Sequence, residues 1–397
     1  MTPIRLIAGD RDLRLTAVLM ILLGAFICSL GPYVSILAVR EFGLGDTGYA
    51  AVMIVSTVVS VTAAIAAGIR ADQTANRRSI TLASCWLMVA GCGLMTVLPG
   101  PVSFVLAHAL ILPLSAVFGQ LFAQGRLAAN RHAPTIRDGI MTTIRALFAL
   151  PFLLVLPVWA LAFQNGVQVW AIYPVTTLIA LVMVLLTALY WPTAAAAGWQ
   201  DKPSGLSLRQ ALRELMSPAL GLRIVALGAV SAGGTAYWAI MGLVLSGAGA
   251  GGTATAALYA GLVAGLEVPL MLALPLILPH FKRTHLILAG TIIYTGQLVG
   301  IPLLAGTPLL WLCLIPGAIG GAITLTLPIA YLQDALGHRP GTGAALMALM
   351  KVASDILAAA SFALGTALSG YMLAAVLAAV VTVLGALALV WADRTAE

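Results

Sequence analysis

Long apolar runs separated by short polar segments make up most of the chain. A helix that crosses about 30 Å of hydrocarbon needs about 20 mainly apolar residues. Runs of this length predict twelve membrane-spanning helices, near residues 15–39, 48–69, 79–98, 102–124, 139–163, 167–191, 222–246, 254–279, 286–304, 308–332, 342–368 and 370–391. The pattern therefore predicts an all-α membrane protein.

One polar interruption, residues 192–221, is longer than the others and separates six spans from six spans. This predicts a segment 1–14, an N-terminal six-helix half 15–191, a linker 192–221, a C-terminal half 222–391 and a tail 392–397. Arg209 and Arg213, set among Leu208, Leu212 and Leu215, indicate a short amphipathic helix at the membrane surface within the linker.

Composition supports the membrane assignment, because 61% of residues are hydrophobic and 8% are charged. Soluble domains carry about 25% charged residues, and disordered chains combine low hydrophobicity with high charge. Cys28, Cys85, Cys92 and Cys313 lie in apolar runs, so we expect buried thiols and neither disulfides nor a metal site. The polar start through Arg14 lacks a cleavable signal, and the first apolar run is interpreted as the first span.

The basic residues predict an orientation. With the N-terminus inside, 17 of the 20 Lys and Arg residues fall on the cytoplasmic side, as the positive-inside rule requires. Arg40 falls outside, and Arg145 and Lys351 fall within spans. Both termini are therefore predicted to be cytoplasmic. The net charge of +7 reflects topology, so no nucleic-acid partner is expected.

The two halves share a pattern, since a basic loop follows the second span of each, at residues 70–78 and 280–285. Many secondary transporters consist of two such halves that rock about a substrate site near the midplane. We expect the same alternating-access architecture here, with a small-molecule substrate and the lipid bilayer as partners.

The loop after the second span resembles the loop signature of the major facilitator superfamily. It runs from Gly68 through Asp72 to Arg77, Arg78 and Ser79. The resemblance implies a cytoplasmic gate, in which Gly68 permits close helix packing and Asp72 and the arginines form contacts that break when the gate opens. An ordinary positive-inside loop is the alternative for Arg77 and Arg78.

Shorter stretches are similar to the bacterial sugar efflux transporters of that superfamily. They begin at Arg40, Gln120, Arg145, Ala264 and Gln333. This resemblance implies the major facilitator fold, proton-coupled efflux of small sugars, location in the bacterial cytoplasmic (inner) membrane and a monomer without cofactor. Arg126, Asp334 and Arg339 join the implied gate, with membrane anchoring as the alternative for Arg126 and Arg339. Val155-Leu156-Pro157 keeps only the proline of the Gly-Pro motif frequent in antiporters, so proton-coupled uptake stays open.

Glu267 lies near the middle of the eighth span, and Pro269 loosens the helix beside it. An ionisable residue inside the membrane is costly and points to function. We therefore assign proton coupling to Glu267, with a structural glutamate as the alternative.

Lys351 and Asp355 are four residues apart in the eleventh span, a spacing that places both on one helix face. They are assigned to the coupling site with Glu267. A buried salt bridge with no transport role is an equal alternative.

Sugar binding requires polar partners for hydroxyl groups and an aromatic face for the ring. Arg145 can face the substrate or extend to the membrane surface. The candidates are Arg145, Gln120, Tyr33, Tyr237 and Trp238, with His108 and Tyr259 as further polar groups. Helix packing is the alternative role for the aromatic residues.

No phosphate-binding loop, zinc-binding spacing or nucleophile elbow occurs, so an enzyme, a metal site and a cofactor are not expected. A channel is disfavoured because no filter-like repeat is present. The closest competing function is a proton-driven multidrug or amphiphile exporter, for which the 13 Met residues suit an apolar pocket. A proton-coupled uptake symporter is the next alternative function.

Overall fold

The computed structural model describes residues 3–192, 218–247, 251–335 and 340–394. The predicted surface helix of the linker lies outside these residues. So does Arg339 of the predicted gate.

The described residues contain twelve helical segments long and apolar enough to cross a membrane, which confirms the predicted spans. The protein is a multi-pass membrane protein, and no strand occurs in the described part. After α1 (Pro3–Gly9), the first six spans are α2 (Arg11–Leu30) with α3 (Val34–Ile36) and η1 (Leu37–Glu41), α4 (Gly45–Thr74), α5 (Arg77–Val97), α6 (Pro101–Val105) with η2 (Leu106–Ile111), η3 (Leu112–Leu114) and α7 (Val117–Ala129), α8 (Pro134–Gln164), and η4 (Val169–Ala171) with α9 (Ile172–Tyr190). The last six are α11 (Pro218–Leu245), α12 (Gly252–Ile277) with η5 (Leu278–His280), α13 (Arg283–Leu304), η6 (Pro308–Cys313) with α14 (Leu314–Ala335), α15 (Pro340–Leu368), and α16 (Tyr371–Arg394).

The first and fourth spans contain π-helical turns, which the apolar pattern does not predict. They are η1 and η2, at residues 37–41 and 106–111. Such turns occur often at functional sites because they redirect side chains. Here η1 carries Arg40 and η2 carries His108.

The turn between α4 and α5 has a strained start and a capped end. Ala75 adopts a left-handed conformation with φ of 51°, which is uncommon for a residue other than glycine. Asn76 then caps α5, its side chain accepting a hydrogen bond from the Ser79 backbone N–H at 3.2 Å. A Cβ at Gly68 of α4 would meet nothing within 4 Å among the described residues. Close helix packing at Gly68 stays a prediction.

Contacts divide the chain into two compact units. Unit 1 comprises Met1–Leu30, Thr62–Leu156 and Trp170–Gly205, and unit 2 comprises Gly31–Val61, Pro157–Val169 and Leu206–Glu397. Two segments of the predicted N-terminal half, Gly31–Val61 and Pro157–Val169, therefore group with unit 2. The division of the chain at the linker stays a prediction.

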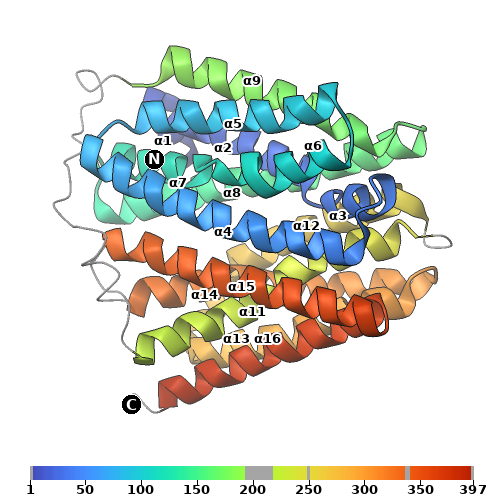
Figure 1. Ribbon diagram of the computed structural model, residues 1–397. Coiled ribbons are helices and arrows are strands. Elements are labelled where there is room, and N and C mark those ends of the chain that lie inside the picture. Colours follow the sequence, from blue (N-terminus) through green and yellow to red (C-terminus); the bar gives the residue numbers. More distant parts are fainter. Residues whose placement is uncertain (1–2, 193–217, 248–250, 336–339, 395–397) are drawn as a thin grey trace. The chain divides into compact units, whose positions relative to one another are not determined.

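In unit 1, helices pack closely where small residues occur. α5 and α9 run side by side (Figure 1), and α2 packs on α7 and α9. A Cβ at Gly24 of α2 would lie 2.2 Å from the Phe148 carbonyl oxygen, and one at Gly125 of α7 would lie 3.2 Å from Thr16 and Ile144 side-chain carbons. Glycine therefore permits these approaches, as in other membrane helix pairs.

In unit 2, α11 is the central helix and packs on α13, α15 and α16. A Cβ at Gly228 would lie 2.5 Å from the Ala353 Cβ of α15. A Cβ at Gly385 of α16 would lie 2.5 Å from the Ala229 Cβ of α11. Small residues on both partners therefore bring α11 into close contact with α15 and α16.

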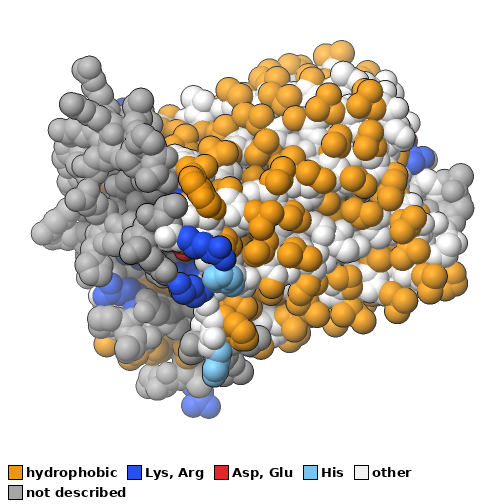
Figure 2. All heavy atoms as spheres, turned by 90° about the horizontal axis from the view of Figure 1, so that it is seen from below, with side chains coloured by type: hydrophobic (Ala, Val, Ile, Leu, Met, Phe, Trp, Pro, Cys, Tyr) orange, Lys and Arg blue, Asp and Glu red, His pale blue; other side chains and the backbone are white. Residues whose placement is uncertain are grey.

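The surface matches a lipid environment. Figure 2 shows apolar side chains over most of the face drawn, with most of the visible Lys, Arg and His side chains toward one end. All four cysteines are buried and free, as predicted. Their burial supports the interpretation as small apolar groups.

Candidate functional site

Glu267 of α12 lies against a glycine-rich face of α14. A Cβ at Gly321 would lie 2.0 Å from the Glu267 Oε1 atom, so a larger residue there would displace this carboxyl group. Gly317 and Gly320 have the same relation to α13: their Cβ atoms would lie 2.3 Å from the Gln297 side chain and 2.6 Å from Tyr294. Gly321 and Gly317 thus accommodate polar side chains of α12 and α13, and Gly320 allows close approach of the α13 backbone at Tyr294.

These groups belong to a larger assembly, the glutamate cluster, which consists of Glu267, Tyr237, Tyr259, Tyr294 and Gln297. Glu267 and Tyr294 lie against neighbouring glycines of α14, Gly321 and Gly320. The rings of Tyr237 and Tyr294 are 6.3 Å apart, and Gln297 Nε2 donates to the Tyr259 hydroxyl at 3.2 Å. Residues from α11, α12 and α13 therefore meet in one polar group within unit 2.

Two atoms of the glutamate cluster are buried without a hydrogen-bond partner among the described residues. They are the Tyr237 hydroxyl and the Gln297 Oε1 atom. Buried polar atoms are nearly always paired, so an exception marks a position that can bind a polar molecule. Trp238 packs beside Tyr237 with ring centroids 5.2 Å apart.

The second intramembrane assembly, the lysine–aspartate cluster, consists of Lys351, Asp355, Thr57 and Thr235. Lys351 Nζ lies 2.6 Å from Asp355 Oδ2, so the predicted pair forms. Thr57 of α4 donates to Asp355 Oδ2 at 2.9 Å, and Thr235 of α11 donates to Oδ1 at 3.2 Å. Three helices of unit 2 therefore hold this carboxylate.

The two charges of the pair have different surroundings. The Asp355 side chain is 9% exposed and the Lys351 side chain is 58% exposed. Burial of an unpaired carboxylate is costly, and the ammonium and two hydroxyls offset that cost. The structure shows the ion pair that the spacing predicted, and a role for it in coupling stays a prediction.

In unit 1, two predicted residues of different roles contact each other. The Arg77 guanidinium donates to the Gln120 Oε1 atom at 3.4 Å, and Gln120 is 4% exposed. Arg78 donates to the Ala188 carbonyl oxygen of α9 at 2.7 Å. The predicted gate residue Arg77 thus holds the predicted substrate residue Gln120.

A surface cavity of about 330 Å³ adjoins this loop. Its lining comprises Arg70, Thr74, Asn76, Ser79, Ile80 and Ala83.

Among the other predicted gate residues, Asp72 and Asp334 lie in α4 and α14, but their side chains are outside the described part of the chain. Arg126 is exposed at the end of α7.

Two other predicted substrate residues have contrasting environments. Arg145 is an exposed residue of α8 and makes no hydrogen bond or ion pair within the described residues. Tyr33 is fully buried in unit 2, and its ring lies edge-on to Phe163 at 5.2 Å. Exposure leaves Arg145 accessible, whereas the Tyr33 ring serves packing in this conformation.

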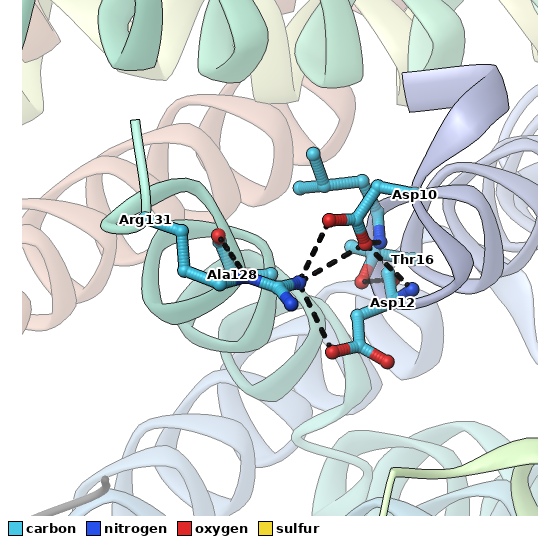
Figure 3. Close-up of polar contacts among 6 residues, drawn as sticks. Asp10, Asp12, Thr16, Ala128 and Arg131 are labelled. Carbon is cyan, nitrogen blue, oxygen red and sulfur yellow. Dashed lines mark hydrogen bonds and ion pairs between the residues drawn. The ribbon is translucent and has the colours of Figure 1, made fainter. Parts of the chain in front are cut away.

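Sequence reasoning missed an ion-pair cluster at the start of α2 in unit 1. Figure 3 shows the Arg131 guanidinium between Asp10 and Asp12, at 2.8 and 3.1 Å. Asp10 Oδ1 also accepts hydrogen bonds from the backbone N–H groups of Asp12 and Leu13, which caps α2. An aspartate directly before an apolar helix was the available signal. The cluster ties the first span to the end of the fourth.

A second missed contact joins the fourth and sixth spans. The His108 Nε2 atom in η2 shares a hydrogen bond of 2.9 Å with the Tyr173 hydroxyl of α9. The His108 ring also stacks on Phe104 with centroids 4.5 Å apart. Both members of the hydrogen bond are buried.

Arg40 has a partner in unit 2 that its position in the sequence does not reveal. Its guanidinium donates to the Leu243 carbonyl oxygen near the end of α11 at 2.7 Å. A cation at a helix C-terminus interacts favourably with the helix dipole. Nearby, Tyr371 donates to Asp46 at 3.0 Å.

In the described residues, no group of three or more His, Cys, Asp or Glu could hold a metal ion.

No protein-family model matches the chain, and no curated protein matches its sequence. Solved structures do match. The nucleoside transporter NupG aligns with a TM-score of 0.76 at 14% identity, over 97% of this chain and 99% of that one. The D-xylose-proton symporter aligns with a TM-score of 0.69 at 13% identity, over 94% and 95%. The human organic anion transporter MFSD10 (TETRAN) aligns with a TM-score of 0.60 at 14% identity, over 94% and 97%.

At these identities the likeness shows the fold. The chain has the twelve-helix fold of the major facilitator transporters, as the sequence predicted.

Proposed function

We propose that this protein is a secondary active transporter of the major facilitator superfamily that exports small sugars or sugar-like molecules by alternating access, coupled to protons. The glutamate cluster carries the proposal, because it sets an intramembrane carboxyl group among polar side chains with unpaired atoms. The similar structures support a carrier, since their names describe transporters of nucleosides, D-xylose and organic anions.

The glutamate cluster suits a hydroxylated solute. Tyrosine hydroxyls and the Gln297 amide can donate to and accept from sugar hydroxyl groups. Trp238, beside Tyr237, offers an aromatic face for the apolar side of a sugar ring. We assign Tyr237 and Trp238 to substrate binding on this basis, with Arg145, Gln120 and Tyr33 as further candidates.

Glu267 is the proposed coupling group. No cation among the described residues pairs with it, whereas Asp355 is paired with Lys351. Binding or release of a proton at Glu267 therefore changes the net charge of the glutamate cluster. Pro269, two residues later, removes a backbone hydrogen bond and lets α12 respond locally.

The proposed cytoplasmic gate comprises Gly68, Asp72, Arg77, Arg78, Arg126, Asp334 and Arg339. Its support in unit 1 is the bond between Arg77 and Gln120, which links the start of the third span to the fourth. We place the protein in the bacterial cytoplasmic membrane as a monomer with both termini inside, on the strength of the basic-residue distribution and the family resemblance.

The decisive experiment is flux into proteoliposomes under an imposed pH gradient, with labelled sugars, nucleosides and hydrophobic cations as solutes. Sugar flux driven against the proton gradient supports the proposal. Sugar movement in the same direction as protons would instead indicate a symporter. Flux of hydrophobic cations without any sugar flux would indicate an amphiphile exporter and exclude the sugar assignment.

A further inference from the structure

The Asp355 carboxylate is fixed more firmly than a simple ion pair requires. It accepts from hydroxyls of two different helices, through Thr57 and Thr235, and from the Lys351 ammonium. Thr235 also shares a hydrogen bond of 3.3 Å with the Ser354 hydroxyl. With these partners the carboxylate, and with it the position of the ammonium, is held in one place.

The Lys351 ammonium remains available to a ligand. Lysine has three N–H donors, of which Asp355 accepts one, and no other described residue accepts the remaining two. The lysine side chain is 58% exposed while its partner is 9% exposed. The pair therefore presents its positive end and buries its negative end.

The exposure of Lys351 is not exposure to lipid. The exposed apolar side of α15 contains Ile356, Ala360 and Leu364, spaced four residues apart. Lys351 and Ala360 are nine residues apart, and nine residues make two and a half helical turns. Lys351 thus lies on the opposite side of α15 from this apolar stripe. A charged side chain exposed to lipid is costly, which also indicates that Lys351 does not face lipid.

One side of α11 continues this accessible region. In the middle of α11 the half-exposed residues are Ser231, Gly234, Thr235 and Trp238, whereas the residues between them are buried. Their spacing of three and four residues places them on one helix face. A Cβ at Gly234 would meet nothing within 4 Å. This face therefore combines hydroxyls, open space and an indole, and Thr235 connects it to Asp355.

We propose that Lys351 binds an anionic group of the transported molecule, and that the substrates are hydroxylated organic acids such as sugar acids. The ammonium would pair with a carboxylate, the Ser231 and Thr235 hydroxyls with substrate hydroxyls, and Trp238 with the carbon skeleton. Asp355 is a positioning residue that holds the ammonium toward the accessible side. The proposal rests on the proposed transport function and specifies its substrate class.

A Lys351–Asp355 pair with only a structural role predicts a different outcome from an anion-binding site. If the two charges only neutralise each other, replacing both with neutral residues leaves transport intact, because neither is then left unpaired. The double variant Lys351→Met with Asp355→Asn tests this, since it preserves size and removes both charges. Lys282→Met removes an exposed lysine charge at the start of α13 and is the matched control.

The experiment measures exchange of labelled gluconate, glucuronate and glucose in proteoliposomes, together with gluconate binding to the detergent-solubilised protein by calorimetry. We expect the double variant to melt near the wild-type temperature and to lose gluconate exchange by about tenfold or more. Lys282→Met is expected to retain gluconate exchange.

Three results would overturn the anion site. The double variant could exchange gluconate as well as wild type does, wild type could carry glucose but neither carry nor bind the acids, or the two proteins could bind gluconate equally. If no sugar or acid moves at all, the proposed transport function fails, and gluconate binding that depends on Lys351 would still support the anion site. Absence of binding in that case would overturn it.

Discussion

The Glu267 carboxyl group fills the space beside Gly321, where a Cβ would lie 2.0 Å from Oε1. The absence of a side chain at this position of α14 therefore leaves the space that a carboxyl group of α12 occupies. This close approach is the specific steric relation between the two helices at Glu267. Substitution of Gly321 and substitution of Glu267 each test this relation.

Gly321→Ala should displace the Glu267 carboxyl group. Alanine favours a helix by about 1 kcal/mol over glycine, but overpacking costs about 1–3 kcal/mol, so we expect a small net loss of stability. Proton-driven flux should fall by about tenfold, since catalytic geometry is sensitive to shifts of about 1 Å. Flux in proteoliposomes and melting in detergent measure the two effects.

Gly296→Ala on α13 is the matched control, because its Cβ would meet only the Pro316 Cβ at 3.7 Å, an ordinary contact. We expect unchanged flux and unchanged or slightly increased stability. Equal losses of flux in both variants would show that the Gly321 position has no special relation to Glu267.

Glu267→Gln should abolish proton-driven transport and spare substrate exchange, because the amide keeps the shape and hydrogen bonding of the side chain but carries no exchangeable charge. Glu41→Gln, at an exposed position, is the control. Driven and exchange fluxes are compared in the same vesicles. Survival of driven transport in Glu267→Gln would move the coupling role elsewhere, with Asp355 next to be tested.

Arg131→Ala should lower the unfolding free energy by about 1 kcal/mol, since the guanidinium is partly exposed and such pairs contribute little individually. Its two acidic partners would then repel each other at the start of α2. Arg5→Ala, an exposed basic residue of α1, is the control for loss of a positive charge. Identical melting of the two variants would mean that the Arg131 contacts add nothing to stability.

Tyr173→Phe should lower the unfolding free energy by about 1–3 kcal/mol, because it leaves the buried His108 Nε2 atom without its partner. Combining it with His108→Phe should restore part of the loss, since neither polar atom is then left unpaired. Tyr190→Phe on the same helix removes an exposed hydroxyl and should have little effect. Additive losses in the double variant would contradict a direct His108–Tyr173 interaction.

Local features of the structure follow readily from the sequence. Each span was predictable because the bilayer thickness requires an apolar run of fixed length, and the end of a run is visible in the sequence. The Lys351–Asp355 pair was predictable for a similar reason, since residues four apart share a helix face. The placement of Glu267 within its span was also predictable.

The partners of these residues were not predictable. Thr57 and Thr235 reach Asp355 from 298 and 120 positions away, and threonine is too common in membrane helices to signal a specific contact. Gly321 gives no sign of which side chain it accommodates, because its role depends on how α14 and α12 pack. The π-helical turns η1 and η2 escaped prediction because apolar runs show no change of period there.

The central place of α11 in unit 2 has a consequence for biosynthesis. α11 leaves the ribosome soon after the linker, whereas α16, which Gly385 brings into close contact with α11, is the last of the twelve described spans to leave it. Until α16 is inserted, the small residues of α11 near Gly385 lack this packing partner. A premature stop within the 24 residues of α16 would therefore disrupt unit 2 at its central helix, although it truncates only one of the twelve described spans.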